Sequence, residues 1–182
     1  MKPSYDKSDK ESVLNFAKKL RNKTLREVCD TAISSHSYSG KGNFGQLLEK
    51  FYFLYELNSE SEADFNEIGV ELKSSPLKQL KNKEYRAKER LVLNIINYFA
   101  VINEDFTTSS FWKKNANILL VFYLHKANQN VLDHIIKLVD EWNFPRTDLE
   151  IIKRDWETIK KKISDGRAHE LSEGDTFYLG LS

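Results

Sequence analysis

The stretch DFNEIGVELKSSP, Asp64 to Pro76, decides how this chain is interpreted. Apolar and polar residues alternate along it, with Ile68, Val70 and Leu72 set against Gly69, Glu71 and Lys73. A period of two predicts a β-strand with one apolar face and one face that carries an acid and a base. Because charged side chains seldom lie on a strand that enters a core, the pair Glu71 and Lys73 requires an explanation.

Asp64, Glu71 and Lys73 have the spacing that a metal-dependent phosphodiesterase needs. Two carboxylates can hold Mg²⁺, which keeps several water molecules and takes its remaining ligands from the substrate phosphate. Glu71 and Lys73 project from one face of a strand, and the Leu72 carbonyl between them can ligate where the strand has an open end. Glu49, on a preceding helix, could complete a second metal position or orient a water molecule.

The same residues also fit a half-exposed edge strand on which Glu71 and Lys73 form a surface ion pair of little energetic value. Three neighbouring features favour the metal site: the predicted strand itself, the apolar helix that carries Glu49, and a basic stretch immediately after Pro76. Together they indicate a metal-dependent nuclease, although a short motif alone carries a substantial false-positive risk.

At 182 residues and 40% apolar content, the chain is long enough for one domain with a substantial core and short for two. Its apolar runs are too short to cross a membrane, and its first residues are polar and do not resemble a secretory signal. The single cysteine, Cys29, excludes an internal disulfide. A cytoplasmic protein without a membrane partner is therefore expected.

Positive charge is concentrated in LKQLKNKEYRAKERL, although the net charge of the chain is only +1. Residues 78–90 contain six basic side chains and two acidic ones. A local surplus of this size can bind several phosphates through counterion release. The candidates for DNA contact are Lys81, Lys83, Arg86 and Lys88. Charge alone fits equally well a solvated loop or helix face.

Four helices are predicted. Apolar residues recur at helical spacing over two ranges, 9–21 and 44–55. Two capping boxes, in which a threonine is followed three residues later by a glutamate, begin two further helices at Thr24 and Thr147. The second of these can close at Gly166.

Strands are predicted between these helices and at the end of the chain. Residues 91–98 and 118–123 are apolar enough for central strands, and residues 68–73 show the alternation described above. Residues 131–139 fit either a strand or a helix, and DTFYLGLS, residues 175–182, is typical of a strand. Helices at both ends of a block of strands predict an α/β or α+β domain built on a mostly central sheet.

KGNFGQLLE, residues 41–49, followed by DFNEIGVELKSSP, resembles the paired motifs of the MutH family. This family comprises a mismatch-repair nicking enzyme and type II restriction endonucleases that cut at GATC. KERLVLNIINY, residues 88–98, and GRAHELSEG, residues 166–174, are more similar to the restriction enzymes. The resemblance runs from about Lys41 to the end of the sequence, and four ordered blocks are a stronger signal than one triad.

The resemblance implies a PD-(D/E)XK restriction-endonuclease-like fold, in which a mixed central sheet is flanked by helices and the active site lies at one end. It implies that Asp64 and Glu71 are metal ligands, that Lys73 is the active-site lysine and that Glu49 is the helical carboxylate. Ala63 stands where many of these nucleases have a proline, at a position that varies in the family.

The resemblance also implies roles for two more lysines. Lys41 would lie near the site, in the loop before the helix that carries Glu49. Lys114, in TTSSFWKKNA, falls where the family has another lysine close to the scissile phosphate.

The implied function is that of a Mg²⁺-dependent type II restriction endonuclease domain, which hydrolyses phosphodiester bonds of double-stranded DNA at unmethylated GATC. Cutting two strands requires two active sites or two sequential engagements, so a dimer on DNA or reloading is implied. Residues 1–182 are expected to form a single catalytic domain that ends before the base-recognition loop and a C-terminal DNA-binding domain. Two alternatives remain open: a MutH-like nicking enzyme with mismatch-repair partners, and a noncatalytic DNA-binding module on the same fold.

Overall fold

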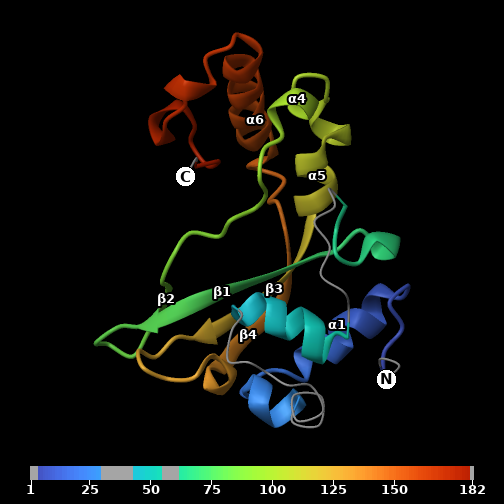
Figure 1. Cartoon of the computed structure of the whole chain (residues 1–182), viewed down its shortest axis with the longest axis vertical. Helices are drawn as coiled ribbons and strands as arrows, with labels where there is room; N and C mark the ends of the chain where they lie inside the picture. Colours follow the sequence, from blue (N-terminus) through green and yellow to red (C-terminus); the bar gives the residue numbers. More distant parts are fainter. Residues whose placement is uncertain (1–3, 30–42, 55–61, 181–182) are drawn as a thin grey trace.

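The computed structural model describes residues 4–29, 43–54 and 62–180, in which a four-stranded sheet adjoins a group of helices (Figure 1). The strands are β1 (Glu71–Gln79), β2 (Tyr85–Ala87), β3 (Asn117–Leu124) and β4 (Ile135–Asn143). The helices are α1 (Lys10–Lys18), α3 (Phe44–Leu47), α4 (Tyr98–Val101), α5 (Ser110–Asn115) and α6 (Leu149–Ser164). Shorter helical turns are η1 (Leu48–Tyr52), η2 (Asn66–Ile68), η3 (Phe106–Thr108), η4 (Val131–Asp133), η5 (Ala168–Glu170) and η6 (Glu173–Asp175). No helix in this part of the chain is long and apolar enough to span a bilayer.

The sheet has the order β2-β1-β3-β4 and mixes both strand orientations. β1 runs parallel to β3, from Glu71 opposite Ile118 to Leu77 opposite Leu124. β2 is antiparallel to β1 and β4 is antiparallel to β3. Because β2 pairs only with the end of β1, it leaves the beginning of β1 uncovered. The parallel pair is joined by a crossover that contains α4 and α5, which confirms the predicted α/β class.

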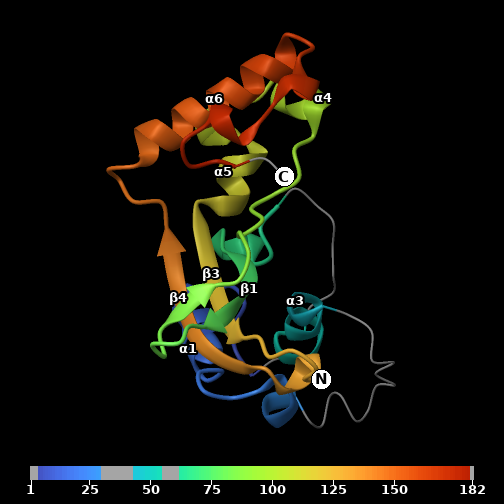
Figure 2. The ribbon, with the colours of Figure 1, turned by 90° about the vertical axis from the view of Figure 1, so that its left-hand side faces the viewer.

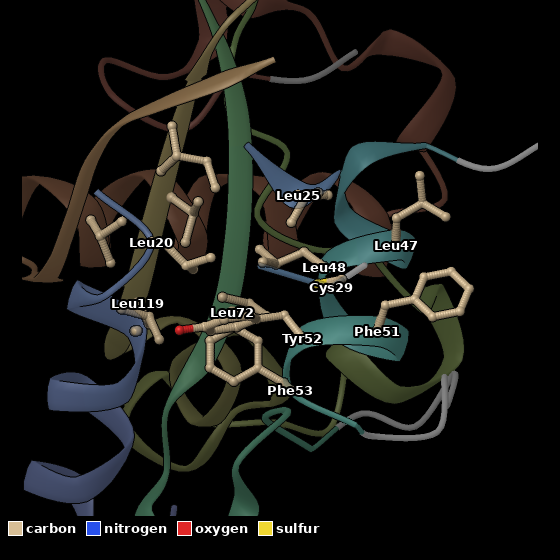
Figure 3. Close-up of a cluster of buried hydrophobic side chains, with 14 of the residues drawn as sticks. Leu20, Leu25, Cys29, Leu47, Leu48, Phe51, Tyr52, Phe53, Leu72 and Leu119 are labelled. Carbon is tan, nitrogen blue, oxygen red and sulfur yellow. The ribbon is translucent and has the colours of Figure 1, made fainter. Parts of the chain in front are cut away.

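The larger hydrophobic core lies between the sheet, α1 and the helical residues 44–52. Figure 3 shows Leu72 of β1 and Leu119 of β3 among side chains that include Leu20, Leu48 and Phe53. All five are buried. This packing fixes the helical segment that carries Glu49 against the strand that carries Glu71.

A second core joins the helices at one end of the sheet, where α4, α5 and α6 stand together (Figure 2). Its buried members include Phe106, Phe111, Phe144, Trp156 and Leu179. Phe111 belongs to α5, the helix that also carries Lys114. The two cores therefore approach each other where β1 begins and α5 ends.

Three of the predicted helix boundaries can be checked against cap geometry. The capping box at Thr24 is confirmed, because its N–H donates to Glu27 Oε2 at 2.7 Å and the Glu27 N–H donates to Thr24 Oγ1 at 3.2 Å. The box predicted at Thr147 is wrong: its hydroxyl donates to Asp148 Oδ1, and α6 begins after Asp148 without a side-chain cap. Gly166 has a φ of +71° and closes α6 as predicted.

The helix predicted over residues 44–55 is α-helical only at its start. An Asn43 cap leads into α3, and the chain then widens into the π-helical turn η1, where the Phe53 N–H donates to the Leu48 carbonyl at 3.1 Å. The helical residues Phe44, Leu47, Leu48 and Phe51 are buried, as the periodicity predicts. Tyr55 lies outside the described residues.

The strand predicted over residues 68–73 begins only at Glu71. Ile68 ends the turn η2, and Gly69 has a φ of +61°, which suits glycine because it lacks a Cβ. Phe65 and Val70 then pair across this turn through backbone hydrogen bonds of 2.9 and 3.2 Å. The alternation before Glu71 thus reflects a tight reversal of the chain, not an extended strand.

The central strand predicted over residues 91–98 does not form, and the segment runs without a sheet partner to α4. Leu93 and Ile96 pack against the second core, whereas Val92 and Ile95 are exposed. The alternation of buried and exposed apolar residues in this segment therefore arises because one side of it packs on helices, not on a sheet. By contrast, the strand predicted over 118–123 is confirmed as β3, and the open choice at 131–139 resolves into η4 followed by β4.

The strand predicted at the end of the chain is also wrong for its described part. Consecutive N–H groups of Phe177, Tyr178 and Leu179 donate to the carboxylate of Asp155 in α6, at distances of 2.6 to 3.1 Å. Asp155 is itself buried. A side chain satisfies these amides, so the segment needs no neighbouring strand.

Candidate active site

Asp64 and Glu71 face each other where the chain turns into β1. The Leu72 N–H donates to Asp64 Oδ2 at 2.9 Å, and the Asp64 N–H donates to Glu71 Oε2 at 3.3 Å. The reversal at Gly69 makes this possible, because it brings residues that are seven positions apart to the same place. Two reciprocal hydrogen bonds therefore hold the Asp64 loop against the start of the strand.

Two lysines converge on Glu71. Lys73 Nζ lies 2.8 Å from Glu71 Oε1, and Lys114 Nζ, from α5, lies 3.8 Å from the same oxygen. The Glu71 side chain is only 3% exposed, while the two lysine side chains are 18% and 21% exposed. A buried carboxylate of this kind requires compensating charge, which the two ammonium groups provide.

Glu49 completes the group from η1, immediately after α3. The pKa of Glu49 is raised to about 7, chiefly by burial and also by the carboxylates of Asp64 and Glu71, while Lys73 and Lys114 act to lower it. The structure thus brings together the five residues predicted to be catalytic, which are Glu49, Asp64, Glu71, Lys73 and Lys114. The predicted site residue Lys41 lies outside the described residues.

The Leu72 carbonyl lies on the same edge of the sheet as Asp64. The Leu72 N–H donates to Asp64 Oδ2 and not to the neighbouring strand β3. The N–H and C=O groups of one strand residue point to the same side, so the carbonyl of Leu72 also faces away from β3. The predicted ligands Asp64, Glu71 and Leu72 are therefore adjacent.

These residues fit a hard divalent cation. Within residues 4–29, 43–54 and 62–180, no three His, Cys, Asp or Glu side chains are arranged to hold a metal by themselves. Mg²⁺ does not need such a group, because one or two carboxylates, waters and substrate phosphate suffice. Burial raises the pKa of Glu71, and the Asp64 carboxylate adds to the rise. A bound cation would relieve this repulsion. Asp64, Glu71 and Glu49 do not enclose a single metal position. Glu49 therefore fits a position beside the cation better than the role of a third ligand to it.

The predicted DNA-contact residues lie elsewhere. Lys81, Lys83, Arg86 and Lys88 are exposed on the hairpin formed by β1 and β2, which projects from the sheet in Figure 1. The eight steps along β1 from Glu71 to the hairpin span roughly 26 Å at 3.3 Å per residue. The basic residues are therefore not part of the carboxylate site.

Two features of the site were missed at the level of sequence. Asn43 Oδ1 accepts from the Gln46 N–H at 2.9 Å and the Asn43 N–H donates to Gln46 Oε1 at 3.3 Å, which forms a capping box at the start of α3. Its N-x-x-Q pattern is readable from the sequence. The close approach of Gly45 to β1 is the second feature, and no local pattern indicates it.

Comparison with known proteins adds independent information. A sequence profile of the family described as "DNA mismatch repair enzyme MutH" matches residues 53–155. The chain is 45% identical over 172 residues to the type II restriction enzyme Sau3AI of Staphylococcus aureus, an alignment that covers 93% of this chain and 34% of the enzyme. It is 26% identical over 156 residues to the DNA mismatch repair protein MutH of Buchnera aphidicola subsp. Baizongia pistaciae (strain Bp), covering 84% and 70% of the two chains. The chain spans about a third of the length of the restriction enzyme.

Proposed function

This chain belongs to the MutH family, whose PD-(D/E)XK-like fold it shares, and we propose that it is the catalytic domain of a Mg²⁺-dependent endonuclease that hydrolyses phosphodiester bonds of double-stranded DNA. One observation carries the proposal. Asp64, Glu71 and Lys73 converge with Glu49 and Lys114, although these residues come from four separate segments of the chain. One ion pair would compensate the charge of buried Glu71, so the fold alone does not require three acids and two lysines to gather at the start of β1.

Asp64, Glu71 and the Leu72 carbonyl would hold Mg²⁺. When bound, the cation polarises the scissile phosphate and promotes ionisation of the attacking water. Lys73, 2.8 Å from Glu71 Oε1, would orient or deprotonate that water and offset charge on the phosphate in the transition state. Lys114 adds a second positive charge on the same side, and Glu49 orients water at the rim.

The target we propose is unmethylated GATC. The support is the resemblance of residues 88–98 and 166–174 to restriction enzymes that cut this sequence, together with the 45% identity to an enzyme named as a type II restriction enzyme. One active site faces one strand at a time, so cleavage of both strands requires two copies on the DNA or reloading. We propose that two copies act together.

A second candidate is a nicking enzyme of mismatch repair. The matching profile carries that description, and the alignment with the Buchnera protein covers most of both chains. Hemimethylated plasmid separates the two functions: nicking confined to the unmodified strand, and stimulated by a partner protein, favours the repair role.

We also propose that Lys41 contacts DNA near the site and that Lys81, Lys83, Arg86 and Lys88 contact phosphates through the projecting hairpin. All four hairpin residues are exposed, as electrostatic contact with a polyanion requires.

The decisive experiment compares the chain with its Lys73→Ala variant on plasmids with and without GATC, in Mg²⁺. Circular dichroism first establishes that both are folded at the assay temperature, since Lys73→Ala removes a partner of buried Glu71. We expect the variant to lose cleavage by two or more orders of magnitude, the scale typical of a group that stabilises transition-state charge. Lys126→Ala, at an exposed loop position, is the control and should cleave normally.

Equal cleavage by Lys73→Ala and the unchanged chain would remove Lys73 from the reaction. Binding of DNA in Ca²⁺ without any cleavage in Mg²⁺ would instead favour the noncatalytic DNA-binding module. Cleavage that does not depend on GATC sites would contradict the proposed target.

A further inference from the structure

Gly45 lies where α3 comes close to β1, near the proposed active site. A Cβ added at Gly45 would stand 3.1 Å from Ser74 Oγ, 3.5 Å from Asn43 Oδ1 and 3.9 Å from Glu49 Oε1. The first distance is shorter than ordinary van der Waals contact, so a side chain at this position would push α3 and β1 apart or displace Ser74.

The contact between Gly45 and Ser74 lies between Glu49 on the helical segment and Glu71 and Lys73 on the strand. Gly45 and Glu49 are four residues apart and lie on the same helical face. Ser74 directly follows Lys73 on β1 and is three residues beyond Glu71. The width of the Gly45–Ser74 contact therefore sets how far the carboxylate of Glu49 stands from the strand that carries the other catalytic groups.

The rest of α3 leaves little freedom to absorb a displacement. Asn43 and Gln46 close the capping box at its start. The Phe44 ring stacks on Tyr123 of β3 with ring centroids 3.9 Å apart, and Leu48 is fully buried. Because the helix is held at these points, a side chain added at Gly45 would mainly displace the helical face that carries Glu49.

We infer that Gly45 is a positioning residue, whose missing side chain allows Glu49 to reach the carboxylates of Asp64 and Glu71. This inference rests on the proposed function of the site. Gly45 has no side chain with which to act on a substrate or ligate a metal. Its contribution is the close approach of helix and strand, because a Cβ at this position would require the Ser74 hydroxyl or the helix itself to shift by a few tenths of an ångström.

The test is a set of four variants: Gly45→Ala, Ser74→Ala, the double variant, and Gly174→Ala. Gly174 is the matched control, because a Cβ there would meet only Ser172 Oγ at 3.8 Å. Two quantities are measured for each variant. The first is plasmid cleavage as a function of Mg²⁺ concentration, and the second is the shift of the thermal unfolding midpoint on addition of Mg²⁺.

We expect Gly45→Ala to lower cleavage about ten-fold, because small displacements of catalytic groups have large effects on rate. It should also raise the Mg²⁺ concentration needed for half-maximal activity and reduce the thermal shift. Alanine favours helical backbone over glycine, so the unfolding midpoint without Mg²⁺ should not fall. Ser74→Ala and Gly174→Ala should match the unchanged chain, and the double variant should recover both readouts because the hydroxyl that meets the new Cβ is gone.

The inference is overturned if Gly45→Ala matches the unchanged chain in both readouts, or if the double variant recovers neither. It is also overturned if Gly45→Ala alone unfolds while Gly174→Ala does not, since the role would then be purely structural. Absence of cleavage by the unchanged chain would count against the proposed function, and the order of the Mg²⁺-induced thermal shifts would still decide the role of Gly45.

Discussion

At the scale of single residues, the site is a group of acids whose charge is only partly compensated. Glu71 is 3% exposed and is approached by two lysines, whereas burial and two neighbouring carboxylates raise the pKa of Glu49 to about 7. The arrangement is unfavourable for the metal-free chain and suited to binding a cation. Functional sites commonly sacrifice stability in this way.

The first prediction concerns Glu49→Gln. Glutamine has nearly the same shape but carries no charge, so it removes repulsion from Asp64 and Glu71. We expect a higher unfolding midpoint than that of the unchanged chain at pH 8 in EDTA, and a smaller stabilisation on addition of Mg²⁺. Thermal unfolding followed by circular dichroism measures both. Glu84→Gln, at an exposed hairpin position, should change neither. A lower midpoint for Glu49→Gln in EDTA would show that the ionised carboxylate stabilises the fold.

The residues of the site were predictable to different degrees. Asp64, Glu71 and Lys73 are candidates because of their spacing, which suits the chemistry of a Mg²⁺ site, and because a predicted strand, an apolar helix and a basic stretch lie beside them. Lys114 could be assigned only through resemblance, since its approach to Glu71 depends on how α5 packs. Gly45 could not be found at all, because its role lies in a distance between two elements.

At the scale of elements, the sequence predicts those that are defined by their own pattern. β3 is continuously apolar, and α6 shows five apolar residues at helical spacing, so both were predicted correctly. Residues 91–98 are also mostly apolar, yet their inward side chains pack on helices. Residues 177–179 bind Asp155 with their backbone amides. A strand needs a partner, and local pattern does not reveal whether one is present.

The second prediction concerns the stack of rings that joins α3, β3 and His134, the residue that follows η4. His134 is 4% exposed and stacks on Tyr123, which in turn stacks on Phe44. Its Nδ1 is buried without a hydrogen-bond partner in the described part of the chain. Burial lowers the pKa of His134 below its usual value, His125 lowers it further, and Asp133 opposes the change.

The folded chain therefore binds fewer protons at His134 than the unfolded chain does. Stability from this residue is present above its unfolded pKa of about 6.5 and is lost as the pH falls below that value. We expect urea unfolding to show a steeper loss of stability from pH 7 to pH 5 in the unchanged chain than in His134→Phe, which keeps the stacking. Parallel curves for His134→Phe and the unchanged chain would contradict this account.

At the scale of the whole molecule, the proposed active site lies where the two hydrophobic cores meet. Glu71 begins a strand of the sheet, and Lys114 belongs to a helix of the second core. The basic hairpin lies at the other end of β1 (Figure 1). The proposed catalytic groups and the densest positive charge are thus separated by roughly 26 Å, the length of β1.

The third prediction follows from this separation. At 3.4 Å per base pair, 26 Å corresponds to about eight base pairs of duplex. A duplex that follows β1 from the active site must extend at least that far to reach the hairpin. We expect the double variant Lys81→Gln and Lys83→Gln to bind a 40-base-pair duplex more weakly in Ca²⁺. The slope of log K against the logarithm of the salt concentration should become less steep by about two. Binding of a 10-base-pair duplex centred on the target should be unaffected.

Fluorescence anisotropy at several salt concentrations measures both affinities. The control is the double variant Lys18→Gln and Lys153→Gln, which removes the same charge from exposed positions on α1 and α6. A general electrostatic effect would weaken binding equally in both double variants and on both duplexes. Loss confined to the hairpin variant on the long duplex would assign the hairpin to DNA outside the target sequence. Equal loss on the short duplex would place the hairpin at the target itself, and would require the DNA to cross β1 instead of following it.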